Sequence, residues 1–262
     1  MPPTPEVAEI APLDAPTVSG RAVMQSFNRP YPVTVPMVGL MALVPVYLII
    51  AHQVRGHRLH APALALDRWF PLSPAWALVY GALYLFLILL PVFVIREVVH
   101  IRRLFLAYLM VWLAAYACFL AYPTVAPRPT QVIGDGFAIW GLRFLYAADP
   151  PYNCFPSIHV AHSFVSAFAC YPLHRGLGVF ATCCAVLVGV STLFTKQHYV
   201  LDVIAGVCLA TVAAGLFLRR AARGPKSATD RLMAPALAIC TAVVVGFAFG
   251  CYWAAYLFGL NP

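Results

Sequence analysis

The chain has 262 residues, of which 62% are hydrophobic and only 10% charged, and its mean hydropathy is +0.83. These values exclude an ordinary soluble domain and indicate an integral membrane protein. The net charge of +8 does not indicate a nucleic-acid partner, because membrane proteins collect Lys and Arg on their cytoplasmic loops. Seven of the eight cysteines lie in apolar runs, so we expect neither a disulfide framework nor a zinc site.

Residues 1–32 are rich in proline and acidic side chains and lack the features of a cleaved signal peptide, so we predict a flexible tail. Seven apolar stretches follow, each close to the roughly 20 residues that a spanning helix needs. They cover residues 33–51, 75–95, 104–126, 156–173, 176–194, 200–218 and 232–258. We therefore predict an all-α membrane helix bundle, with a six-span catalytic core (33–218), a basic cytoplasmic loop (219–231) and an appended transmembrane helix (232–262).

The basic residues predict the orientation of these spans. Eleven of the 17 Lys and Arg residues lie on the same side as the N-terminus when the spans alternate, and that side is expected to be cytoplasmic. Loops 52–74, 127–155 and 195–199 then face the outside. The longest of them spaces Trp140, Phe144 and Tyr146 as on a helix, which predicts an interfacial lid or amphipathic helix. The compact loops suit a bacterial inner membrane.

Ionisable residues lie at the outer ends of two spans. "NCFPSIHVAHS" places His159 and His162 at the start of the fourth span, and "HYVLD" places His198 and Asp202 at the start of the sixth. Ionisable groups at membrane depth are costly, and they mark functional sites that face a protein interior or a wet cavity. A spacing of four puts His198 and Asp202 on one helix face, where the carboxylate can orient the imidazole as a nucleophile or base.

Nearby groups complete a set suited to phosphoryl transfer. His159 can donate a proton to a leaving group, while three basic side chains and the N–H groups at a helix start hold the phosphate charge. The basic candidates are Arg128, Arg143 and Lys196. Together these residues predict a reaction through a phosphohistidine.

Three other functions use the same residues. His159, His162, His198 and Asp202 could bind a metal ion, which would make the activity sensitive to chelators. Ser157 could serve an intramembrane protease, although the chain lacks a Gly-x-Ser-x-Gly elbow. A transporter would place its polar residues near the middle of the bilayer. Here they gather at one membrane face, which favours chemistry on a lipid headgroup.

Two segments resemble a known family. "FPSIHV" and, some 40 residues later, "STLFTKQHYVLDV" are similar to the motifs Pro-Ser-Gly-His and Ser-Arg-x5-His-x3-Asp of the type 2 phosphatidic acid phosphatase superfamily. The resemblance implies that His198 is the nucleophile, Asp202 its orienting partner and His159 the general acid. It also implies that Ser157 and Ser191 bind phosphate.

The chain departs from those motifs at basic positions. Of Lys-x6-Arg-Pro it keeps Arg128 and Pro129 but has Ala121 at the lysine, while Ile158 replaces the motif glycine and Thr192 the motif arginine. This pattern resembles the branch of inositol phosphorylceramide and sphingomyelin synthases. A phosphodiester carries one charge where a monoester carries about two, so fewer basic ligands fit a diester.

The resemblance therefore implies an enzyme that moves a phospho-headgroup from a membrane phospholipid to a lipid alcohol such as ceramide or diacylglycerol. It implies no cofactor and no metal. The alternative is a lipid phosphate phosphatase in which Arg143 or Lys196 replaces the missing basic ligands.

Overall fold

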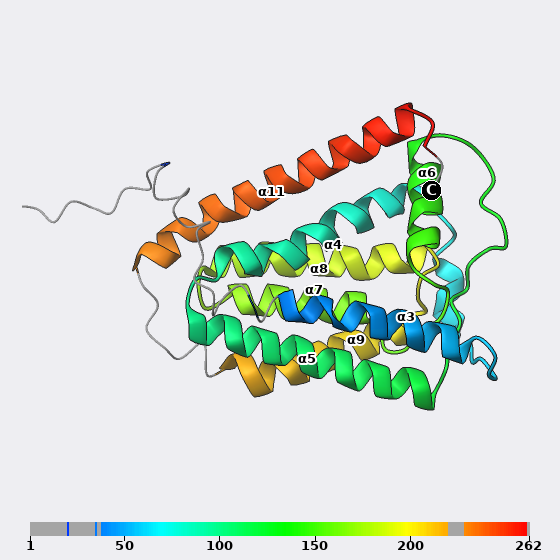
Figure 1. Cartoon of the computed structure of the whole chain (residues 1–262), viewed down its shortest axis with the longest axis horizontal. Helices are drawn as coiled ribbons and strands as arrows, with labels where there is room; N and C mark the ends of the chain where they lie inside the picture. The colour runs from blue at the N-terminus through cyan, green and yellow to red at the C-terminus, as the bar shows by residue number, and fades with distance from the viewer. Residues whose placement is uncertain (1–19, 21–34, 36–37, 220–227, 261–262) are drawn as a thin grey trace, which may run out of the picture.

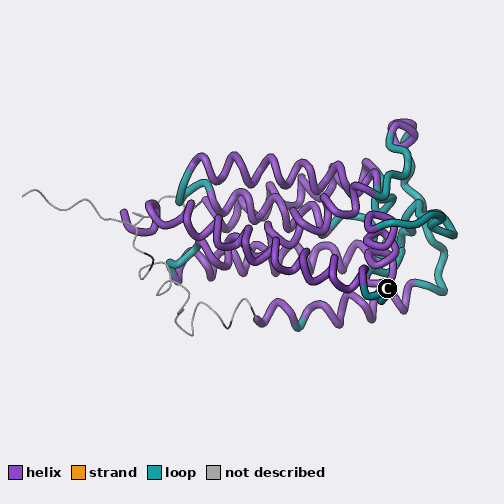
Figure 2. Tube along the Cα trace, turned by 90° about the horizontal axis from the view of Figure 1, so that it is seen from above, coloured by secondary structure: helices purple, strands orange, loops and turns teal. Residues whose placement is uncertain are grey.

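The computed structural model describes residues 20, 35, 38–219 and 228–260, with the backbone alone for 228–230. The predicted tail, apart from residue 20, and most of the predicted basic loop lie outside these residues. The described chain is a bundle in which the long helices run roughly along one common axis, as Figures 1 and 2 show. This confirms the prediction of an all-α membrane helix bundle.

The helices follow one another in a simple order along the chain. Their bounds are α3 Leu43–Val54, η1 Ala65–Trp69, α4 Ala75–Val94, α5 Val98–Ala121, α6 Phe137–Ala148, α7 Ile158–Cys170, α8 Arg175–Phe194, α9 Val200–Ala213, η2 Ala214–Leu218 and α11 Ala228–Leu257. The short η1 is a 3-10 turn, and η2 continues α9 as a π-helix. α5 begins six residues earlier than predicted, so Arg102 and Arg103 lie on its first turns and can extend toward water.

Five described helices are long and apolar enough to cross a membrane: α4, α5, α8, α9 continued by η2, and α11. The first and fourth predicted spans form shorter helices, Val38–Val54 and the 13-residue α7. At 1.5 Å per residue α7 is about 20 Å long, less than the hydrocarbon thickness of about 30 Å. Nearly all of its residues are buried, because α4, α5, α8 and α9 pack around it. Its apolar sequence therefore reflects a position in the protein core.

One end of the bundle gathers the loops that were predicted to share a side. Val125 N donates to His60 O over 3.0 Å, and Ala126 N donates to Pro151 O over 2.8 Å. α6 lies across this end, roughly perpendicular to the bundle axis (Figure 1). The aromatic segment of the longest loop thus forms the short helix that its spacing predicted. We call this end of the molecule the loop end; which side of the membrane it faces stays a prediction.

α6 also connects the loop end to the C-terminal helix. Three rings of α6 pack against three rings of α11, and the six residues are Phe137, Trp140, Phe144, Tyr252, Trp253 and Tyr256. Trp140 Nε1 also donates to the carbonyl of Leu260 over 2.7 Å. α11 packs mainly on α4, so it completes one side of the bundle.

Candidate active site

The two helices that carry the histidines meet closely at the loop end. Ser157, the N-cap of α7, donates its backbone N–H to the carbonyl of Asp202 in α9 over 3.1 Å. Gly206 lies one turn further along α9, and a Cβ at that position would be 2.7 Å from the carbonyl oxygen of Ser157. Only glycine permits this approach. The two motif segments are therefore joined backbone to backbone.

This contact brings His159, His198 and Asp202 into one row. His159 Nδ1 lies 3.2 Å from His198 Nε2, and His198 Nδ1 lies 3.4 Å from Asp202 Oδ2. His198 is 5% exposed and Asp202 is fully buried. The carboxylate faces one imidazole nitrogen of His198, so the tautomer with a proton on Nδ1 leaves a lone pair on Nε2. That lone pair points toward the second histidine.

Two carboxylates accept hydrogen bonds from backbone N–H groups at the start of α9. Asp202 Oδ2 accepts from Tyr199 N over 2.8 Å, which caps the start of α9. A second carboxylate, that of Asp67 in η1, accepts from Val200 N over 2.8 Å. Negative groups at a helix N-terminus are favoured by the helix dipole and by its free N–H groups. The first loop is thereby fixed to the helix that carries the site.

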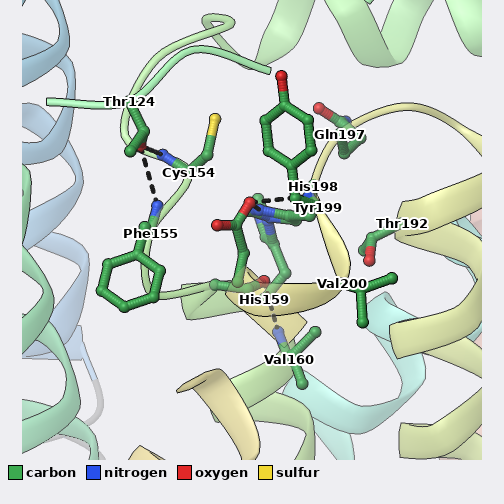
Figure 3. A network of polar contacts seen from close by, with 12 residues as sticks. Thr124, Cys154, Phe155, His159, Val160, Thr192, Gln197, His198, Tyr199 and Val200 are labelled. Atoms are coloured by element: carbon green, nitrogen blue, oxygen red, sulfur yellow. Dashed lines mark hydrogen bonds and ion pairs between the residues drawn. The ribbon is translucent and has the colours of Figure 1, made fainter. Parts of the chain in front are cut away.

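A tight turn between α8 and α9 presents His198. The backbone N–H groups of Gln197 and His198 both donate to the carbonyl of Thr192, over 2.9 and 3.3 Å. Lys196 adopts a left-handed conformation with φ of 55°, which reverses the chain direction within one residue. Figure 3 shows Gln197 and His198 leaving the same turn above His159.

The segment before α7 is fixed by a buried threonine. Thr124 Oγ1 accepts from Cys154 N over 2.9 Å and from Phe155 N over 3.1 Å (Figure 3). The thiol of Cys154 is buried, and burial raises its pKa well above the ordinary value. Cys154 is therefore a neutral thiol and not a nucleophile.

Arg128 lies beside the turn that carries His198. Its guanidinium donates to the carbonyl of Asp149 over 2.6 Å, lies 3.4 Å from the Asp149 carboxylate and also donates to Gln197 Oε1. The ring of Tyr146 packs against it with a centroid distance of 4.7 Å. Tyr146 in turn donates to the carbonyl of Thr195 over 2.7 Å, and burial raises the pKa of its hydroxyl to about 12. A neutral phenol of α6 thus supports both Arg128 and the turn.

The two predicted serine ligands have roles within their own helices. Ser157 Oγ accepts from Val160 N over 3.3 Å, so it caps α7. Ser191 is fully buried and its hydroxyl donates to the Val188 carbonyl over 2.6 Å. Thr192, at the position of the motif arginine, is also buried and donates to the Gly189 carbonyl.

Two predicted basic ligands do not join the histidines. The exposed Arg143 donates to the carbonyls of Val132 and Gly134 over 2.9 and 2.8 Å. Lys196 Nζ donates to the carbonyl of Phe70. Of the three predicted basic candidates, Arg128 alone is connected to the turn that carries His198 by a hydrogen bond from its side chain to another residue of that turn.

The structure adds residues that the sequence did not single out. Gln197 and Asp149 bind Arg128, and Tyr80 and Tyr84 of α4 lie edge-on to His159 at 5.6 and 5.0 Å between ring centroids. The two tyrosines are four residues apart within an apolar span. In the sequence this spacing indicates that they share a helix face, but not that they contact His159.

His162 binds a core side chain of α5. Its Nε2 accepts from Trp112 Nε1 over 2.5 Å within the core. Among the described residues no group of three His, Cys, Asp or Glu side chains is arranged to hold a metal ion.

Comparisons with known proteins bear on the family of the chain. The profile of the PAP2 superfamily matches residues 56–216. A PA-phosphatase related-family protein of Dictyostelium discoideum is 28% identical over 113 residues, a region that covers 37% of this chain and 20% of that protein. No solved structure gives a significant match.

Proposed function

The chain belongs to the PAP2 superfamily, and on that premise we propose that it transfers a phospho-headgroup from a membrane glycerophospholipid to a lipid alcohol such as ceramide or diacylglycerol. The observation that carries the proposal is the row of His159, His198 and Asp202, in which the free nitrogen of His198 faces a second imidazole at 3.2 Å. The row lies where α7 and α9 begin, in a bundle with five described helices of membrane-spanning length, and this location supports a lipid substrate.

The reaction follows from the roles of the three side chains. The lone pair of His198 Nε2 attacks phosphorus, the bond from phosphorus to the leaving alcohol breaks, and protonated His159 gives its proton to the departing oxygen. The acceptor hydroxyl then attacks the phosphohistidine, the phosphorus–nitrogen bond breaks, and His159 takes the hydroxyl proton. Asp202 stabilises the positive charge that develops on His198.

The resting distance between the histidines has a consequence for this sequence of steps. A separation of 3.2 Å is already hydrogen-bond contact and leaves no room for a phosphoryl group. The two rings therefore separate when substrate binds. His159, which is partly exposed and contacted by tyrosine rings of α4, is the ring that moves.

The charge of the site favours a diester over a monoester. Ala121 and Thr192 stand at two basic positions of the superfamily motifs, and Arg128 is accompanied by the Asp149 carboxylate. A headgroup diester brings one negative charge, which this set of residues can accommodate better than the roughly two charges of a monoester.

A second candidate, a lipid phosphate phosphatase, has a specific observation in its favour. The Dictyostelium relative is described as PA-phosphatase related. In this version water replaces the lipid alcohol in the second step, and the phosphohistidine chemistry is unchanged.

Product analysis separates the two. Purified protein is placed in mixed micelles with phosphatidylinositol or phosphatidic acid, with and without ceramide or diacylglycerol, and lipids are identified by mass spectrometry. A phospho-headgroup on added ceramide, or on diacylglycerol whose acyl chains differ from those of the donor, supports the transferase. Free phosphate released from phosphatidic acid without any acceptor supports the phosphatase, and inactivity toward every phospholipid contradicts both.

A further inference from the structure

We propose that the side-chain Nε2–H of Gln197 joins the Nε–H of Arg128, already predicted to bind phosphate, in binding the non-bridging oxygens of the substrate phosphoryl group, and that this neutral side-chain amide selects a singly charged phosphodiester. The inference rests on the proposed function and names the ligands of its phosphoryl group. It assigns the role of an absent basic side chain to a residue that carries no charge.

The orientation of the Gln197 amide is fixed by Arg128. A guanidinium has only donors, so the group of Gln197 that faces it must be the oxygen, and Oε1 accepts from Arg128. The other end of the amide, Nε2, is then a donor that points away from Arg128. This contact settles an assignment that the shape of an amide leaves open.

Two donors are left over at this point. Gln197 Nε2 and Arg128 Nε are both buried, and neither has a hydrogen-bond partner among the described residues. Gln197 is 2% exposed, and the Arg128 side chain is 8% exposed. Buried donors are nearly always hydrogen-bonded in native proteins, so a pair without acceptors marks a place for a ligand that accepts.

One of these donors belongs to the turn that carries the reacting nitrogen. Gln197 directly precedes His198, and both backbone N–H groups bind the same Thr192 carbonyl, so one turn presents the amide and the imidazole together (Figure 3). A phosphoryl group attacked by His198 thus places its free oxygens next to an amide donor and a guanidinium donor. Both geometries are suited to phosphate oxygens.

The charges around this pair decide which phosphate fits. The Asp149 carboxylate lies 3.4 Å from Arg128 and offsets much of its positive charge. Lys196 and Arg143 bind backbone carbonyls elsewhere. An amide gives a hydrogen bond without adding charge, so the pair stabilises one negative charge well and a second one poorly.

Substitutions that change the charge of Gln197 test the proposal. Gln197→Glu replaces the donor with a carboxylate, and Gln197→Lys keeps a donor and adds a positive charge. Gln53→Glu, an exposed position on α3, is the matched control. We measure kcat/KM for phosphatidylinositol with added ceramide, and inhibition by inorganic phosphate, for each full-length variant in the same micelles.

The expected results have opposite signs for the two variants. Gln197→Glu lowers kcat/KM by about 10- to 100-fold and weakens phosphate inhibition at least tenfold, since a hydrogen bond to a charged group is lost and a repulsion gained. Gln197→Lys also lowers kcat/KM for the diester but strengthens phosphate inhibition about tenfold. Gln53→Glu behaves as the wild type.

The outcomes distinguish the inference from the proposed function. Equal inhibition by phosphate in the wild type and in both Gln197 variants overturns the role of Gln197, even if turnover falls. A structural defect lowers the amount of active protein, but it does not make the inhibition constant follow the charge of residue 197. If Gln197→Glu does not fold, Gln197→Lys decides by the same constant. A wild type that acts on no phospholipid contradicts the proposed function itself.

Discussion

Two helix pairs meet at the loop end, and they are held by different kinds of contact. α7 and α9 touch through their backbones, with a hydrogen bond from Ser157 N to Asp202 O and a glycine at the closest point. α6 and α11 touch through aromatic rings with centroids 4.8–6.4 Å apart. The superfamily match ends at residue 216, so it includes α6, α7 and α9 but not α11.

This difference in contact type predicts how precisely each helix pair positions the residues of the candidate site. Where two backbones touch directly, no side chain lies between the helices that could adjust to a displacement. Aromatic rings, in contrast, can slide and re-pack at a small cost in free energy. A shift of about 1 Å in a catalytic group can lower a rate about 10²-fold. We therefore expect activity to depend steeply on the α7–α9 pair and weakly on the α6–α11 pair.

The largest effect is expected at the nucleophile. His198→Ala removes the only nitrogen that the proposed mechanism bonds to phosphorus, so turnover of phosphatidylinositol or phosphatidic acid should fall by at least about 10⁴-fold. His57→Ala, an exposed histidine of the same end, is the control. Comparable activity in the two variants, with both folded by circular dichroism, would contradict a phosphohistidine.

The orienting carboxylate should have the next largest effect. Asp202→Asn keeps the shape but lets the amide donate to His198 Nδ1, which favours the wrong tautomer, so kcat should fall by about 10²- to 10⁴-fold. KM should change little, since Asp202 is fully buried and does not touch the lipid. A variant that loses only affinity would show that Asp202 acts on binding.

A single methyl group tests the tight pair directly. Gly206→Ala places a Cβ 2.7 Å from the Ser157 carbonyl, so α9 must move away from α7 and kcat should fall about 10- to 100-fold. Gly246→Ala on α11, where a Cβ meets nothing within 4 Å, is the matched control and should keep full activity with equal or higher stability. Equal activities would remove the distinction between the two pairs.

Sequence alone predicted the features that depend on local composition. Apolar length predicted the helices, and the cost of ionisable groups in a membrane singled out His159, His198 and Asp202, which the structure brings into one row. The aromatic spacing around Trp140 predicted a short helix, which is α6. These signals lie within a few residues of each other, so they can be recognised without knowing the fold.

Features that depend on distant partners were not predictable in this way. Arg128 binds Asp149, 21 residues away, and Gln197, 69 residues away. In the sequence Gln197 is an ordinary polar loop residue; its burial and its leftover donor arise only when the loops meet. The short length of α7 has a similar origin, because hydropathy cannot distinguish lipid from a surrounding shell of helices.

A modest effect on activity is expected where α6 contacts the turn that carries His198. Tyr146→Phe removes the hydrogen bond to the Thr195 carbonyl but keeps the ring against Arg128. One such bond contributes about 1 kcal/mol, so we expect kcat to fall by about fivefold. Steady-state kinetics should show little change in KM. A fall as large as that of Gly206→Ala would mean that α6 fixes the catalytic turn as rigidly as α9 does.

The smallest effect is expected at the contact between α6 and the C-terminal helix. Trp140→Phe keeps an aromatic ring beside Phe137 and Phe144 but loses the 2.7 Å hydrogen bond to the Leu260 carbonyl. Stability should fall by about 1 kcal/mol, seen as a lower Tm, while activity stays within about twofold because neighbouring rings can re-pack. If activity instead falls tenfold or more in a folded variant, the rings of α11 set the position of the catalytic turn, and the distinction between a fixed pair and a supporting pair is lost.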